Sequence, residues 1–100
     1  MKWELIVCDL KLRVAVIVEN IERILNSDID SDYRNELIEI RKWLLQAARR
    51  EATVGSILRV IEVVCYYVVD WRLLDRDDNI GRSLLRLREA YKTLLKKSVS

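Results

Sequence analysis

The residue types that usually carry chemistry are scarce in this chain of 100 residues. There is no histidine, which removes the commonest metal ligand, the usual general base and the Ser-His-Asp and Cys-His sites. Two cysteines cannot form a structural zinc site on their own, and the chain has no Gly-rich phosphate loop. An enzyme would have to work with carboxylates, tyrosines and arginines. We therefore expect a non-enzymatic protein with no catalytic residue, no metal site and no cofactor.

A polar row in the most apolar stretch, residues 56–74, is the best remaining candidate for such chemistry. Arg59, Glu62, Tyr66 and Asp70 recur there at helical spacing, among mostly apolar neighbours. If the row faced a cavity, a carboxylate in it would have a raised pKa suited to proton transfer. The alternative is that the row is the one face that a largely buried helix turns toward water. We favour this alternative.

The first acidic turn matches part of a calcium-binding loop. Asp28, Asp30, Asp32 and Glu39 occupy ligand positions of the EF-hand pattern, but Tyr33 stands where that loop needs glycine. Acidic residues in such a break also cap the following helix and suit the positive end of its dipole. We therefore predict helix capping rather than calcium binding.

The last predicted helix carries a basic outer face that could bind phosphates without reading base sequence. Its cations are Arg82, Arg86, Lys92 and Lys96, with Glu89 as the one acid among them. Lys42, Arg49 and Arg50 could extend the patch from the second helix. The alternative, which we favour, is a solvated surface, because no aromatic side chain is interleaved with these charges. The net charge of +2 adds no support for nucleic-acid binding.

The two cysteines, Cys8 and Cys65, lie far apart among apolar neighbours. We expect both to be buried free thiols. The alternative is a Cys8–Cys65 disulfide, which would close a long loop and stabilise the fold by roughly 3–4 kcal/mol if the geometry allowed it.

Composition and periodicity predict an all-α fold. Apolar residues make up 51% of the chain and charged residues 34%, with two Gly and no Pro, as is typical of helical proteins. Residues 10–18 alternate as a strand would, but apolar residues recur at helical spacing over a much longer segment. The stretch 56–74 is rich in β-branched residues but too long for a strand. The expected helices span residues 2–26, 31–51, 56–74 and 79–97 of a single domain, 1–100, folded as an antiparallel up-down-up-down four-helix bundle.

These helices carry more apolar faces than one small bundle covers. The first two have a second apolar stripe, and the third is apolar almost all round. Surplus apolar faces of this kind mark interaction surfaces. We therefore expect a homodimer or a higher oligomer, with a candidate interface made of Leu5, Cys8, Leu12, Ile38 and Leu45.

Two hypotheses for function follow. The first is a small helical interaction or assembly module whose partner is itself or another protein. The second is a nucleic-acid-associated protein that uses the basic last helix. A helix-turn-helix reading of residues 47–64 fails, because the helix after the turn presents almost no polar side chains to bases.

The sequence also bears on where the protein works. The apolar N-terminus is interrupted by charges, and the longest uncharged run of the central stretch, 63–69, is too short to span a membrane. We expect a soluble cytoplasmic protein without membrane contact. High charge with few amides is compatible with a thermophilic source.

Overall fold

The protein is all-α over the residues that its structure describes. A computed structural model describes the backbone of residues 2–76 and 78–99, and the side chains of 2–4, 6, 95 and 97–99 lie outside this description. The elements are α1 (Lys2–Leu25), α2 (Ser31–Ala47), α3 (Val54–Asp70), the short 3-10 helix η1 (Leu73–Asp75) and α4 (Ile80–Val99). Within these ranges there is no strand, so a helix is the correct prediction for both ambiguous segments.

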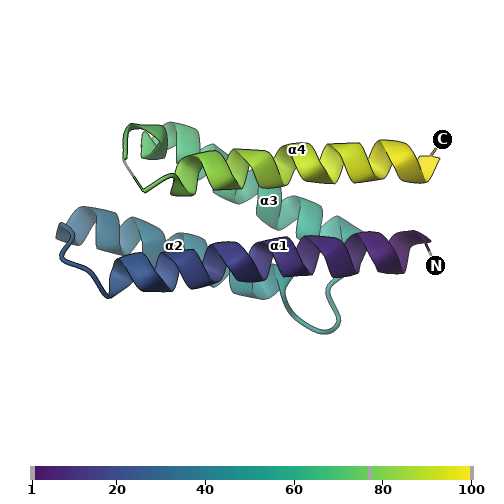
Figure 1. The fold of residues 1–100 in the computed structure, drawn as a ribbon, viewed down its shortest axis with the longest axis horizontal. Helices are drawn as coiled ribbons and strands as arrows, with labels where there is room; N and C mark the ends of the chain where they lie inside the picture. The colour runs from purple at the N-terminus through teal and green to yellow at the C-terminus, as the bar shows by residue number, and fades with distance from the viewer. Residues whose placement is uncertain (1, 77, 100) are drawn as a thin grey trace.

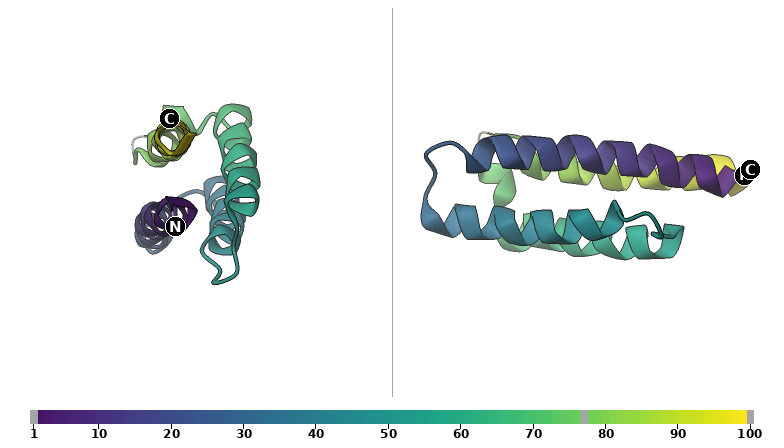
Figure 2. Two further views of the ribbon diagram at one scale, coloured as in Figure 1. Left: turned by 90° about the vertical axis from the view of Figure 1, so that its right-hand side faces the viewer. Right: turned by 90° about the horizontal axis from the view of Figure 1, so that it is seen from below.

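The four helices lie side by side along one direction, and the chain direction alternates from each helix to the next (Figure 1). α1 and α4 form one layer of the bundle, and α2 and α3 form the other (Figure 2). Each helix contacts the one before and after it, α4 closes the ring against α1, and α1 also approaches α3 across the centre. α2 and α4 therefore occupy opposite corners of the bundle.

The ends of α2 and α3 differ from the prediction. α2 ends at Ala47 rather than at residue 51. α3 begins at Val54 rather than at residue 56, because Thr53 and Ser56 form a reciprocal capping box at its start. It ends at Asp70 rather than at residue 74, because Arg72 takes a left-handed conformation with φ of 54° that interrupts the helix.

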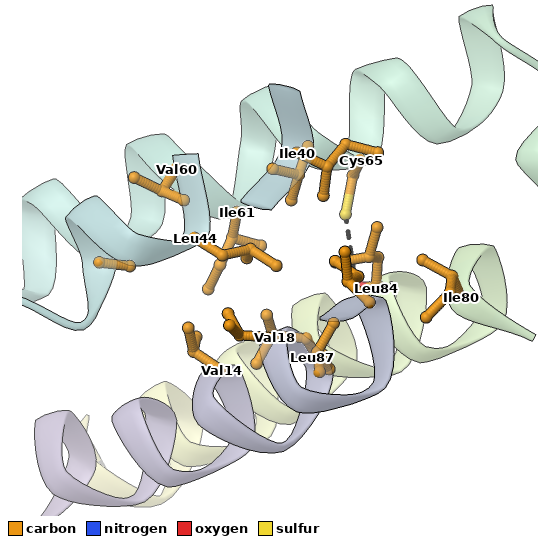
Figure 3. Close-up of a cluster of buried hydrophobic side chains, with 14 of the residues drawn as sticks. Val14, Val18, Ile40, Leu44, Val60, Ile61, Cys65, Ile80, Leu84 and Leu87 are labelled. Carbon is orange, nitrogen blue, oxygen red and sulfur yellow. Dashed lines mark hydrogen bonds between the residues drawn. The ribbon is translucent and has the colours of Figure 1, made fainter. Parts of the chain in front are cut away.

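One hydrophobic core joins all four helices and η1. In the middle of this core, Val14 and Leu87 lie opposite Leu44 (Figure 3). No charged side chain is buried in the described part of the chain. Its buried residues are Leu10, Val14, Ile17, Val18, Ile21, Tyr33, Leu37, Ile40, Leu44, Ala47, Ile57, Val60, Ile61, Val64, Cys65, Val68, Leu73, Ile80, Leu84, Leu87 and Tyr91.

Both cysteines are free, so the disulfide alternative is wrong. Cys65 is buried as predicted, whereas Cys8 is exposed. The Cys65 thiol donates a hydrogen bond to the carbonyl of Leu84 at 3.5 Å (Figure 3). Burial raises the pKa of the Cys65 thiol to about 11, so it stays protonated at neutral pH.

α3 shows more of its apolar surface to solvent than the prediction of an almost fully covered helix allows. Its core residues lie along one side, while Tyr66 and Val69 are exposed on the other. Tyr67 and Trp71 are half-buried and stack on each other, with ring centroids 4.2 Å apart and planes 4° from parallel.

Gly81 lets the start of α4 approach η1 closely. A Cβ on this buried glycine would lie 3.0 Å from the carbonyl carbon of Leu73 and 3.1 Å from the backbone nitrogen of Leu74. The absence of a side chain at Gly81 is thus a packing requirement, which the sequence did not indicate.

Gly81→Ala should therefore lower the free energy of unfolding by about 1–3 kcal/mol, the usual cost of overpacking. Gly55→Ala is the matched control, because the nearest atom to a Cβ there is Thr53 Oγ1 at 3.9 Å. In a helix, Ala stabilises relative to Gly by about 0.5–1 kcal/mol, so this control should be neutral or stabilising. Urea unfolding followed by circular dichroism measures both, and equal stability of the two variants would contradict the close approach.

Candidate interaction surfaces

Most of the strongly exposed large hydrophobic side chains lie on α1 and α2. Every residue of the predicted interface is exposed, and Val16 adds to them. We call this set the α1–α2 apolar surface: Leu5 (73% exposed), Cys8, Leu12 (64%), Val16 (56%), Ile38 (42%) and Leu45 (48%). The second apolar stripes of both helices thus stay outside the core of the single chain.

Two hydrogen bonds show which parts of α1 and of the α2 region lie at the same level. At one end, Lys11 Nζ donates to the carbonyl of Arg50 at 3.2 Å. At the other, Arg34 Nη1 donates to the carbonyl of Leu25 at 2.7 Å and satisfies an acceptor at the end of α1. In this antiparallel register Val16 lies about level with Leu45.

The outer side of α2 is hollowed into a shallow groove of about 460 Å³, which we call the α2 groove. Its apolar residues are Ile38 and Leu45, both part of the α1–α2 apolar surface. Three cations and no carboxylate line it. The complete lining is Ile38, Arg41, Lys42, Leu45, Gln46 and Arg49. The groove therefore combines apolar contact with positive charge.

The predicted phosphate-binding residues of α4 are all exposed, as is Glu89 between them. Beside them, Arg86 and Arg13 line a shallow hollow of about 300 Å³ between α4 and α1, and Val16 of the α1–α2 apolar surface also lines it, on the side of α1 toward α4. The proposed extension through Lys42, Arg49 and Arg50 does not join this surface. Lys42 lies on α2, and Arg49 and Arg50 lie in the turn after this helix. α2 occupies the corner of the bundle opposite α4 (Figure 2).

The polar row of α3 faces solvent. Arg59, Glu62, Tyr66 and Asp70 are all exposed. These side chains lie on the solvent side of α3, and neither carboxylate has the apolar surroundings that proton-transfer chemistry would need.

The first acidic turn caps α2 and ties it to the turn before α4. Asp30 is the N-cap residue: its side chain accepts from the backbone N–H of Tyr33 at 2.9 Å and from Arg76 Nη1 at 3.0 Å. Arg76 also lies over the ring of Tyr33, 4.2 Å from its centroid, and the Tyr33 hydroxyl donates to Asp78. Sequence reasoning found the cap but missed Arg76 and Asp78, because they are distant along the chain.

The residues of the calcium-loop pattern do not gather in one place. Asp28 and Asp30 line a hollow beside Arg76. Asp32 and Glu39 line a different cleft of about 600 Å³, together with Glu36 and the stacked pair Tyr67 and Trp71. In this cleft Glu36 Oε2 is buried without a hydrogen-bond partner among the described residues.

Asp30 and Glu36 should affect stability in opposite directions. The Tyr33 backbone N–H and Arg76 lower the pKa of Asp30, whose ionised form therefore stabilises the fold at neutral pH, and this stabilisation disappears as the pH falls through the folded-state pKa. Burial raises the pKa of Glu36, so the fold favours the protonated form of this carboxyl. The stabilisation that the protonated form contributes is lost as the pH rises through the folded-state pKa.

Asp30→Asn should accordingly lower stability at pH 7, and Glu36→Gln should raise it. Both differences should shrink below about pH 4, where carboxyls protonate even in the unfolded chain. Denaturant unfolding of the two variants and the parent at pH 7 and pH 3 measures this. Changes of the same sign at pH 7 would contradict the assigned environments.

Comparisons of the chain with models of protein families, with curated proteins and with solved structures find no match. Every helix of the described residues is too short or too polar to cross a membrane.

Proposed function

We propose that this chain is a non-enzymatic interaction module that assembles with a second copy of itself through the α1–α2 apolar surface. The observation that carries the proposal is the exposure of this surface on two adjacent helices, although the same chain has a complete core without it. An excess of exposed large apolar side chains on neighbouring helices is typical of a protein–protein interface.

The energetics support association at moderate concentration. Burying one Leu or Ile side chain contributes about 1.5–3 kcal/mol, and a symmetric pair buries each residue twice. Leu12 and Leu45 are the strongest candidates for central positions, since they lie on neighbouring helices and are both well exposed. Several such residues offset the cost of association, which is about 4–15 kcal/mol.

Leu12→Glu or Leu45→Glu should raise the dissociation constant of the dimer by about two orders of magnitude, because each places two charges in the interface and every 1.4 kcal/mol is about tenfold. Light scattering at micromolar concentrations measures the mass. Val69→Glu is the control, since Val69 is 70% exposed but lies on α3.

The control variant should remain a dimer, and circular dichroism should show the same helicity for all three variants. Equal dissociation constants for Leu12→Glu, Leu45→Glu and Val69→Glu would place the interface elsewhere.

The alternative function, phosphate binding through α4, is favoured by one observation. Arg82, Arg86, Lys92 and Lys96 are all exposed on one helix, around a single carboxylate, Glu89. Cations in such an arrangement can neutralise several phosphates and hold nucleic acid non-specifically.

If this alternative holds, affinity for mixed-sequence duplex DNA should fall with salt with a log–log slope of about −3 to −4, as expected for about four neutralised phosphates. Reversing Arg82, Arg86 and Lys92 to Glu should abolish binding in fluorescence anisotropy, whereas reversing the α2-groove cations Arg41, Lys42 and Arg49 should preserve it. Absence of binding at low salt would rule the alternative out.

A further inference from the structure

We infer that the α2 groove of one copy receives α1 of the second copy, and that the contact is reciprocal, so that α1 packs on α2 at two equivalent places. This inference rests on the proposed self-association and specifies its geometry. It follows from the three cations that line the α2 groove and from two exposed glutamates on α1.

The α2 groove needs an occupant that is apolar and acidic. Ile38 and Leu45 give it apolar contacts, and Arg41, Lys42 and Arg49 give it three positive charges. The side chains of these three cations make no hydrogen bond and no ion pair with another described residue. A second copy of the same groove would bring like charges together, and such juxtaposition costs several kcal/mol.

The outer side of α1 has the complementary character. Leu12 and Val16 are followed after three and six residues by Glu19 and Glu22, all four exposed. Neither glutamate has an ion-pair partner within the described residues. Arg23, directly after Glu22, is an exposed cation, so the two glutamates leave residues 19–23 with a net charge of −1.

The register inside one chain shows how the two surfaces would meet. A two-fold axis parallel to the helices places α1 of one copy over α2 of the other and keeps every residue at its own level along the bundle. Lys11 is level with Arg50, and Leu25 is level with Arg34. Val16 of one copy then comes level with Leu45 of the other.

At the same time, Glu19 and Glu22 come level with the stretch from Ile38 to Lys42 in the second copy. Leu5 and Cys8 come level with the start of α3 and the turn before it. An axis perpendicular to the helices would instead set α1 on α1 and α2 on α2, and the second of these contacts would oppose two cationic grooves. The charges therefore select the first arrangement.

Complementary charge reversal tests this pairing. One variant is Glu19→Lys with Glu22→Lys, and the other is Arg41→Glu with Lys42→Glu, the two groove cations at the level of these glutamates. Each alone should dimerise at least about tenfold more weakly than the parent, because both of its contacts then oppose like charges. Their equimolar mixture should form heterodimers with nearly the parent's dissociation constant, because opposite charges face each other again in both contacts.

The chain that carries all four substitutions should dimerise as the mixture does, which guards against a variant that simply fails to fold. Reversal of Glu62 and Asp70, exposed on α3, should change nothing and is the matched control. Sedimentation velocity gives the dissociation constants. A dimeric parent whose two variants are not restored by mixing would overturn the α1-on-α2 pairing alone, whereas a monomeric parent at all concentrations would overturn self-association itself.

Discussion

A four-helix bundle covers roughly one face of each helix, and this geometric constraint decides where the apolar side chains of this chain lie. Each helix gives one stripe to a core with no buried charge among the described residues. Apolar residues on a second stripe cannot be buried within a single copy. Leu12 and Leu45 are therefore exposed, although they have the same side chain as the buried Leu10 and Leu44 beside them.

Because the core is complete without the second stripes, stability and association are separate properties of the molecule. Residues such as Leu44 and Leu84 hold the helices together. The turns add specific polar contacts, among them the cap of α2 by Asp30 and its pairing with Arg76. The outer sides of α1 and α2 are thus available to evolve for binding without loss of the fold.

Helix number, their order and the main core stripes could be predicted from the sequence, because the 3.6-residue period of apolar residues is a local property. The end of α3 could not be predicted. The residue that takes the left-handed conformation there is Arg72, and not the glycine or asparagine that usually signals such an end. The same holds for the exposure of Cys8, since apolar neighbours in sequence do not show which of two stripes faces the core. Contacts between distant turns, such as Arg76 with Asp30, have no local signal at all.

The candidate surfaces were predictable to a similar degree. Helical spacing placed Leu5, Leu12 and Leu45 together as exposed residues, but it could not show that the cations of α2 and α4 lie at opposite corners. That separation divides the positive charge into two surfaces, and the one on α2 includes Ile38 and Leu45. It is the packing order of the helices that makes the α2 groove a distinct site.

Small-angle X-ray scattering over a concentration series tests the central claim, that the α1–α2 apolar surface joins two copies, most directly. The Cα radius of gyration of a single copy is 13.6 Å. Our account predicts that the measured radius rises well above this value as the concentration reaches the micromolar range. The forward scattering divided by the protein concentration should double over the same range. A radius that stays near the single-copy value at every concentration would contradict it.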